Sequence, residues 1–387
     1  MYALRRLEIA LKVIDSYQGE QPLHQYLRSW YRKHPEMGSR DRKLCSELTY
    51  SYFRTGKAFL NLSGNQKIAI SLYLVFNKPQ DYLEEIISEC TPVDPATLVL
   101  PIKDKLKIIE AYFPHDTHDF FPFSNLSSGI DMYECALNML TQPFAWIRVE
   151  PDKLSSVIQL LDNNTISYYS EGNAIGFKNG INLEMLGLNK KWYTIQDRNS
   201  QMTGNYFLSQ PNEKWYDCCA ASGGKSLLLH SLNPTVKLTV SDNRSSIIEN
   251  LKERFDEKKL LNYRSFIIDL EDGNILLQDE EFDGIIADVP CTGSGTWART
   301  PEQVVFFNSD DIMHYAQRQR KILRSVSALL RHGKPLIYIT CSVFREENED
   351  IVAFLCDELD FICEEMKVLS GNHHFSDTMF VARMIKK

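Results

Sequence analysis

Hydrophobic residues recur every three or four positions through the first 111 residues, between polar positions. The first such set is Leu4, Leu7, Leu11 and Ile14, and the next is Leu23, Tyr26, Leu27 and Trp30. One apolar side per turn is typical of amphipathic helices that pack against one another. The pattern therefore predicts an N-terminal helical bundle that ends near the second of two proline-containing loops, at 92–101 and 114–122.

Cations gather at one end of this bundle. Arg28, Arg32 and Lys33 precede the segment from Gly38 to Arg54, which itself carries several basic residues. A charged run of this kind is most often a solvated helix face, so composition alone does not assign it to a ligand.

The pattern changes at Phe144, where short apolar runs replace the helical spacing. We expect strands at 144–149, 166–170 and 174–177 and a helix at 152–161, which together make a small α+β unit. Arg148 is expected to be exposed, and with the aromatic residues Trp146, Tyr168 and Tyr169 it could contact RNA. Aromatic residues in strands more often belong to a core.

From residue 215 to the end, strand-like and helix-like segments alternate. Strands are expected at 215–218, 237–241, 264–268, 284–287 and 336–340, and amphipathic helices at 246–259 and 312–330. Such alternation predicts a parallel, doubly wound α/β sheet with helices on both faces.

Composition narrows the class of protein. The chain has 387 residues, a formal net charge of −8 and nine cysteines without a Cys-x-x-Cys pair, which indicates reduced thiols and no zinc cluster. No apolar run is long enough to span a membrane and the start lacks a signal-peptide core, so we expect a cytoplasmic protein. We also expect it to be a monomer without a metal. The net negative charge argues mildly against a nucleic-acid partner, although a local basic face on the protein could still bind one.

A glycine-rich turn from Asp217 to Ser226 lies between the first expected strand of the α/β part and the next helix. It is not a phosphate loop, because Cys219 stands where the first glycine of that signature belongs, and no Gly-x-Gly-x-x-Gly occurs there. The turn indicates a nucleotide-like ligand with a carboxylate for Lys225. Three acids follow at further strand ends and suit the hydroxyl and amino groups of an adenosine: Asp242, Asp269 and Asp288.

Two thiols stand at the ends of neighbouring expected strands. Cys291 follows the strand that ends near Asp288, and Cys341 ends the strand at 336–340. A single cysteine at such a place usually packs, but two thiols, an aspartate and a glycine-rich loop can form one reactive pocket.

Three segments together resemble the signature motifs of RNA cytosine-5 methyltransferases: Asp217 to Ser226, Asp288 to Glu302 and Tyr338 to Glu349. The match is strongest with the Sun family of bacterial ribosomal RNA enzymes, which joins a helical NusB-like domain to the catalytic part. Trp192 to Ser200 is similar to the segment ahead of that family's cofactor loop. The resemblance implies a NusB-like RNA-binding domain at 1–122, a small α+β RNA-binding subdomain at 123–205 and a Rossmann-like methyltransferase domain at 206–387.

The resemblance also implies roles for individual residues. S-adenosylmethionine would be held by the turn made of Cys219, Ala220, Ala221, Ser222, Gly223, Gly224 and Lys225, with Asp242 at the ribose and Asp269 at the adenine. Cys341 would attack C6 of a cytosine in RNA, and Cys291 would assist release of the product. Asp288 would face both cofactor and base, and could bond N3 if its pKa were raised in a dry pocket.

The chain departs from the family at two positions of the turn, with Ser222 for the usual proline and Ser226 for threonine. We expect the serine at 222 to relax the turn and weaken its preorganisation. The expected substrate is 16S ribosomal RNA, with transfer RNA as the alternative. A DNA cytosine-5 methyltransferase, with Cys291 as nucleophile, and a non-catalytic RNA-binding assembly factor are the rival hypotheses.

Overall fold

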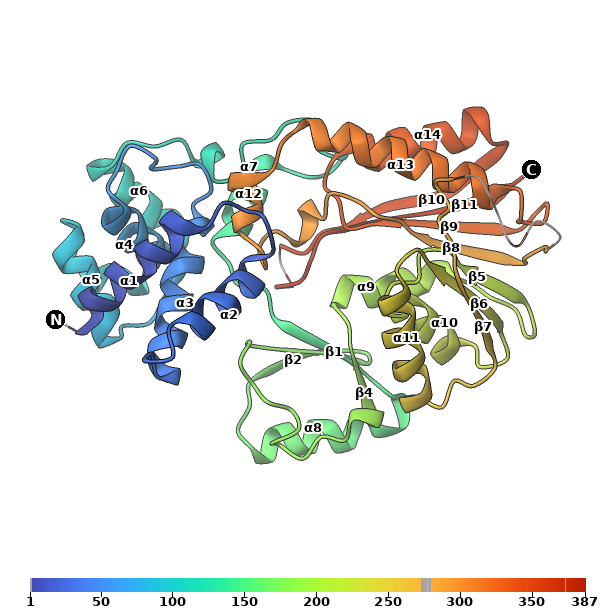
Figure 1. Ribbon diagram of the computed structural model, residues 1–387, viewed down its shortest axis with the longest axis horizontal. Coiled ribbons are helices and arrows are strands. Elements are labelled where there is room, and N and C mark those ends of the chain that lie inside the picture. The colour runs from blue at the N-terminus through green and yellow to red at the C-terminus, as the bar shows by residue number, and fades with distance from the viewer. Residues whose placement is uncertain (1, 273–276, 278–279, 373) are drawn as a thin grey trace. The chain divides into compact units, whose positions relative to one another are not determined.

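The computed structural model describes residues 2–272, 277, 280–372 and 374–387, and its chain forms two compact units. The first unit runs from the N-terminus to Ser124 and adds Asp131–Gln142 and Trp297–Asn308. It is helical (Figure 1). Its helices are α1 (Tyr2–Ser16), α2 (Leu23–Lys33), α3 (Ser39–Arg54), α4 (Gly64–Val75), α5 (Asp81–Cys90), α6 (Ile102–Tyr112), α7 (Met132–Met139) and α12 (Glu302–Phe306), with 3-10 turns at Pro95–Val99 and Thr117–Phe120.

Buried polar contacts tie the segment at 297–308 to the helices of this unit. The Arg54 guanidinium, fully buried, donates through Nη1 to the carbonyl oxygens of Met139 and Ala298, each at 3.0 Å. The carboxylate of Glu302 accepts a 3.1 Å hydrogen bond from the backbone N–H of Leu23, at the first turn of α2. That N–H has no partner inside its own helix, so Glu302 satisfies a group that would otherwise be buried without a bond.

The second unit contains a small antiparallel sheet in the order β2-β3-β1-β4. Its elements are β1 (Ala145–Val149), α8 (Leu154–Asn163), β2 (Tyr168–Glu171), β3 (Ala174–Phe177) and β4 (Tyr193–Ile195). The pattern predicted all of these except β4. Trp146 packs opposite Gly176, where an added Cβ would lie 2.6 Å from the indole ring.

The expectation that Arg148 is exposed was wrong. On β1, Trp146 and Arg148 are both buried, because the strand pairs on both sides and packs on the rest of the unit. Tyr169 on β2, an edge strand of this sheet, is 58% exposed. Of the aromatic residues considered for RNA contact, Tyr169 is therefore the accessible one.

The large sheet has seven strands in the order β10-β11-β9-β8-β5-β6-β7 (Figure 1). The five predicted strands are present and parallel: β5 (Lys214–Asp217), β6 (Lys237–Asp242), β7 (Tyr263–Ile267), β8 (Gly284–Asp288) and β9 (Pro335–Thr340). The sheet is mixed, however, and not purely parallel as expected. An antiparallel pair, β10 (Phe361–Leu369) and β11 (Met379–Lys386), joins it beside β9.

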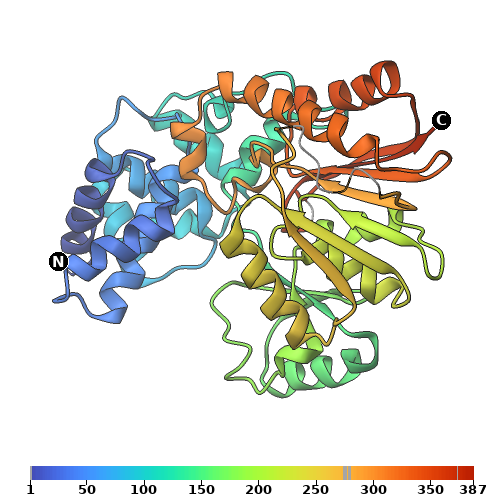
Figure 2. The same ribbon diagram turned by 45° about the vertical axis from the view of Figure 1, so that its right-hand side comes forward.

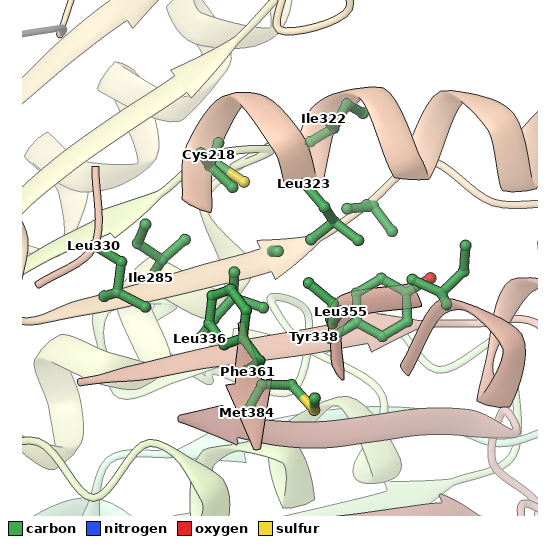
Figure 3. Packing of buried hydrophobic residues seen from close by; sticks show 14 of the residues in the cluster. Cys218, Ile285, Ile322, Leu323, Leu330, Leu336, Tyr338, Leu355, Phe361 and Met384 are labelled. Atoms are coloured by element: carbon green, nitrogen blue, oxygen red, sulfur yellow. The ribbon is translucent and has the colours of Figure 1, made fainter. Parts of the chain in front are cut away.

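Alternate residues of the central strands enter two separate cores, as a sheet covered on both faces requires. On one face Ile285, Leu336 and Tyr338 pack against α13 (Asp310–Ser327) and α14 (Glu349–Glu358), as Figure 3 shows. On the other face Ile286 and Ile337 pack with α10 (Gly224–Leu232) and α11 (Ser245–Glu257). Figures 1 and 2 show the helices on the two faces.

The strand order reverses beside β5. From β5 the chain moves to β6 and β7 on one side, then returns to β8 and β9 on the other. The carboxyl ends of β5 and β8 therefore flank a topological switch point, which is where open α/β sheets bind their ligands.

Candidate functional site

The turn after β5 has a backbone that few side chains tolerate. Ala221 and Gly223 adopt positive φ angles of 46° and 81°. A Cβ at Gly223 would lie 2.4 Å from a ring carbon of Phe255, so this position requires glycine on two grounds. The N–H of Ala221 donates to Asp242 Oδ2 at 3.1 Å, which joins the turn to the end of β6.

Ser222 is anchored and not relaxed, contrary to expectation. Arg254 of α11 donates through Nη1 to both the carbonyl oxygen and Oγ of Ser222, each at 2.6 Å. A proline would keep the first bond and lose the second. Compared with a proline, the serine lacks the ring that restricts φ but gains a charge-assisted hydrogen bond.

Two cavities open at the carboxyl ends of the strands. The larger, about 490 Å³, is lined by predicted residues at or just after the ends of β5, β6, β7 and β8: Cys219, Ala221, Asp242, Asp269, Asp288 and Cys291. The smaller, about 300 Å³, is lined by Cys219, Ala220, Ala221, Ser222, Gly224, Lys225, Asp288 and Cys341. Both cavities are lined by Cys219, Ala221 and Asp288. Gly223 lines neither, and its contribution is the shape of the turn.

The acids of the larger cavity differ in their surroundings. Asp242 is buried and accepts hydrogen bonds from Arg244 through Nε at 2.8 Å and Nη2 at 3.0 Å. Burial alone would raise the pKa of Asp242, but the bonds from Arg244 lower it below its ordinary value. Asp269 is exposed and accepts from the N–H of Glu271 at 3.0 Å.

Lys225 joins the turn to the end of β8. Its ammonium lies 2.8 Å from Asp288 Oδ2 and donates to Ser200 Oγ at 2.9 Å. The sequence suggested a ligand carboxylate as the partner of Lys225, and the structure provides a protein carboxylate. Lys225 and Asp288 therefore form one charged pair between the two cavities.

Asp217 is a fully buried acid of the site. Oδ2 accepts a 2.6 Å hydrogen bond from Ser226, whereas Oδ1 has no partner among the described residues. Burial raises the pKa of Asp217 to about 7. An unpartnered carboxyl oxygen that lines the smaller cavity is suited to a ligand that donates a hydrogen bond.

The thiols of Cys291 and Cys341 are in contact. Sγ of Cys291 and Sγ of Cys341 lie 3.3 Å apart, although 50 residues separate them in the chain. The hydrogen bond with Cys341 and burial both raise the pKa of the Cys291 thiol. A protonated thiol at Cys291 could donate to a thiolate at Cys341 over this distance.

Glu347 links the two loops that carry Cys291 and Cys341 through hydrogen bonds. Its carboxylate accepts bonds from Thr292 N–H at 2.9 Å, Thr292 Oγ1 at 2.6 Å and Gln319 Nε2 at 2.9 Å, and also from Ser342 Oγ. Burial raises the pKa of Glu347, while these donors oppose the shift. The network fixes the relative positions of the segments at 291–294 and 341–348.

Gly295 adds a backbone link between these loops and β11. Its N–H donates to the carbonyl of Cys341 at 2.8 Å, and its own carbonyl accepts from Thr378 N–H at 3.0 Å. A Cβ at this position would lie 2.1 Å from the Thr378 oxygen. The two thiol loops and the start of β11 are thus in direct contact.

Sequence reasoning missed several residues of the site. Gln196, Asp197 and Ser200 line the smaller cavity, and they lie in the segment from Trp192 to Ser200 that was noted only for its resemblance. Asp377 and Met379 line it from the C-terminal hairpin, for which no motif was recognised. Within the described parts of the chain, no group of three His, Cys, Asp or Glu side chains is placed to hold a metal ion, and no helix could cross a membrane.

Solved structures identify the class of this fold. A crystal structure of PH0851 is 18% identical, has a TM-score of 0.70 and covers 99% of this chain and 98% of its own. NSun6 from Pyrococcus horikoshii with SFG is 16% identical, has a TM-score of 0.55 and covers 63% of this chain and 91% of its own. A methyltransferase homologue from the same organism has a TM-score of 0.57 at 20% identity, over 68% of this chain and 92% of its own. The fold is that of a Rossmann-like methyltransferase.

Sequence comparison finds one matching family model and several related proteins. Residues 206–384 match the family described as 16S rRNA methyltransferase RsmB/F. Ribosomal RNA small subunit methyltransferase B of Proteus mirabilis is 31% identical over 64% of this chain and 60% of its own length. The proteins of that name from Shewanella oneidensis and Vibrio vulnificus are 32% and 33% identical, over 50% and 54% of this chain and 47% and 51% of their own. The matches thus span about half to three-fifths of these relatives.

Proposed function

We propose that this protein transfers a methyl group from S-adenosylmethionine to C5 of a cytosine in RNA, with 16S ribosomal RNA as the substrate. The observation that carries the proposal is the pair of thiols beside Asp288, where a cofactor-sized cavity meets a smaller one. The family of residues 206–384 and the names of the relatives support the choice of ribosomal RNA.

The residues present fit the cofactor. The larger cavity has the acids Asp242 and Asp269 at successive strand ends, which suit ribose hydroxyls and an adenine amino group. The unpartnered Oδ1 of Asp217, in the smaller cavity beside the turn, suits an ammonium group. The bound cofactor would supply an electrophilic methyl group. NSun6, which shares the fold, was solved with SFG, an S-adenosylmethionine analogue.

Cys341 is the proposed nucleophile. Cytosine C5 is a poor nucleophile, and addition of the Cys341 thiolate to C6 makes the ring an enamine whose C5 can take the methyl group. A water molecule then takes the C5 proton, the electron pair of that C–H bond re-forms the C5–C6 double bond, and the bond between C6 and Sγ breaks with its electron pair returning to the Cys341 thiolate. The Cys291 thiol, 3.3 Å from Cys341, can stabilise the departing thiolate by donating its hydrogen bond.

The charged pair of Lys225 and Asp288 is proposed to stabilise negative charge at N3 and O2 of the base. Asp288 lines both cavities, and its bond to Lys225 brings a proton donor to the same place. This extends the expectation for Asp288 alone, because Lys225 can supply the proton that an ionised carboxylate lacks.

The helical unit is proposed to hold RNA. A groove of about 680 Å³ is lined by Arg28, Arg32 and Arg42 beside Tyr31 and Tyr50. Three guanidinium groups in one groove suit the phosphates of RNA. This local basic surface offsets a net charge of −8. The domain boundaries proposed above, at 122 and 205, assign the groove to the NusB-like part.

The test compares wild type, Cys341→Ala and the control Cys90→Ala in tritiated methyl transfer to small-subunit RNA. Cys90 lies in α5 of the helical unit, so its substitution should leave transfer intact. Full turnover by Cys341→Ala would refute the assignment of the nucleophile. Bisulfite sequencing of ribosomal and transfer RNA, with and without the gene, identifies the substrate.

Calorimetry addresses the non-catalytic alternative. An assembly factor with a decayed cofactor site would show no heat with S-adenosylmethionine and no protection from thermal unfolding. The proposed enzyme should show both. The same titration with the Asp242→Asn variant should show weaker binding, because the acid proposed for the ribose loses its charge.

A further inference from the structure

A third cavity of the second unit lies between the small sheet and the helices beneath the large sheet, away from the thiols. It has a volume of about 530 Å³. Its walls come from β1, β4, the C-terminal half of α10 and the end of α11. None of its lining residues lines either of the two cavities at the carboxyl ends of the strands. It shares Thr194, Leu227, Glu257 and Lys258 with a neighbouring pocket, which also lacks the thiols.

Arg148 is the buried charge of this cavity. Its side chain lies on β1, the residue is only 6% exposed, and Nε donates to Gln196 Oε1 at 3.1 Å. Among the residues that the structure describes, no carboxylate lies within ion-pair distance of Arg148, and its Nη groups have no acceptor. The Nη atoms are not among the fully buried unpartnered atoms, so within the cavity they remain available to donate to an acceptor from outside the chain.

Thr194 contributes a second unused donor. It lines the cavity from β4, beside β1, where Arg148 and Thr194 are paired residues of the register. Its Oγ1 is buried and has no hydrogen-bond partner in the described part of the chain. Two adjacent strands therefore present a buried guanidinium and a buried hydroxyl to the same space.

The other charges of the cavity are already engaged or lie at its rim. Lys258 donates to the carbonyl oxygens of Lys190, Lys191 and Tyr193, and lies 3.6 Å from Glu150. Asp152 pairs with Lys153 at 2.8 Å. Five cations and three carboxylates line the cavity: Arg148, Lys153, Lys191, Lys258 and Lys259, with Glu150, Asp152 and Glu257. The excess charge is positive, which favours an anion.

We propose that this cavity binds a phosphate group, held by the Nη groups of Arg148 and the hydroxyl of Thr194. The planar guanidinium matches two phosphate oxygens, and a third oxygen can accept from the threonine. The group comes either from the backbone of RNA or from free inorganic phosphate. The RNA source rests on the function proposed above, whereas the free ion does not.

The first experiment titrates the full-length protein with inorganic phosphate by calorimetry, without cofactor or RNA. The variants are Thr194→Val and Arg148→Gln, with Lys252→Gln on the exposed side of α11 as the control. Valine keeps the shape of threonine and removes a hydroxyl that bonds nothing in the chain, so this variant should fold even if Arg148→Gln does not. Loss of the charge-assisted bond should weaken binding by roughly tenfold.

The second experiment measures RNA affinity of the same proteins against salt concentration, again without methyl transfer. If RNA supplies the phosphate, inorganic phosphate competes with RNA and Arg148→Gln lowers the slope of log affinity against log salt by roughly 0.7 to 0.9. If the free ion is the ligand, phosphate binds wild type and RNA affinity is unchanged in Thr194→Val. Absence of phosphate binding by wild type, together with unchanged RNA affinity in both variants, overturns the proposal whether or not the protein methylates RNA.

Discussion

The sulfur atoms of Cys291 and Cys341 lie 3.3 Å apart at the ends of two adjacent parallel strands. This distance allows an S–H···S hydrogen bond in which either sulfur can donate, and the bond together with burial raises the pKa of the Cys291 thiol. The cavities distinguish the two thiols, because Cys341 lines the smaller cavity with Lys225 and Asp288, whereas Cys291 lines the larger one. We therefore propose Cys341 as the nucleophile, and not Cys291 as in the arrangement of a DNA methyltransferase.

Cys291→Ala is expected to accumulate a covalent complex with RNA. The variant keeps the nucleophile and loses the donor that eases departure of the Cys341 thiolate, so addition outpaces release. A band that resists SDS and disappears on RNase treatment would reveal the complex on a gel. Cys291→Ala/Cys341→Ala should show no such band, and a band that persists in the double variant would contradict the assigned roles.

Asp217 should make the folded state less stable as the pH rises from about 4 to about 7. Its pKa in the folded protein is about 7 because of burial, against 3.8 for the ordinary group. Within this window the folded protein binds the proton and the unfolded chain does not, so the free energy of unfolding falls with rising pH, by on the order of a few kcal/mol. Urea unfolding of Asp217→Asn between pH 4.5 and 8 should show a flatter profile, because asparagine does not titrate and still accepts from Ser226.

Ser222→Ala should weaken cofactor binding, by roughly tenfold at most, because it removes one of the two bonds that Arg254 makes to the turn. Calorimetry with S-adenosylmethionine measures the change. Ser222→Pro retains the carbonyl bond and restricts φ, so it should bind more tightly than Ser222→Ala. Equal affinities of wild type and Ser222→Ala would show that the hydrogen bond from Arg254 to Ser222 Oγ does not order the turn.

Arg54→Leu should destabilise the helical unit by about 2–4 kcal/mol, because two buried carbonyl oxygens lose their charged donor. Burial lowers the pKa of Arg54 to about 10, so the group is still charged at neutral pH. The urea midpoint of the helical signal measures the effect. Arg40→Leu on the exposed side of α3 provides the control and should leave the midpoint unchanged.

The parallel strands and their helices could be predicted because their signals are local. Continuous apolar runs such as Leu336 to Thr340 and the spacing in α11 and α13 are readable within one segment. Strand β10 of the C-terminal hairpin was missed because the adjacent Glu364 and Glu365 interrupt its apolar residues and the strand is largely exposed, so it lacks a buried-strand pattern. The apolar start of β11 is buried and was overlooked. Arg148 was misjudged because a guanidinium is usually exposed, and only tertiary packing buries it.

The site was predictable where it follows strand ends and unpredictable where it depends on pairing across the fold. Asp242, Asp288 and Cys341 stand at carboxyl ends of strands, so sequence and topology suffice to gather them. The bond of Lys225 to Asp288 and the buried carboxylate of Glu347 join segments more than 50 residues apart. No local pattern specifies such partners, although Glu347 lay within a recognised motif.

The contact of Gly295 with Thr378 makes the smaller cavity depend on the C-terminal hairpin. β11 lies between β9 and β10 and pairs with both strands. Without β11 the loop at Gly295 would lack its bond from Thr378, and the smaller cavity would lack the wall formed by Asp377 and Met379. The enclosure of the Cys341 sulfur therefore depends on the completed sheet, and not only on the strand that precedes the thiol.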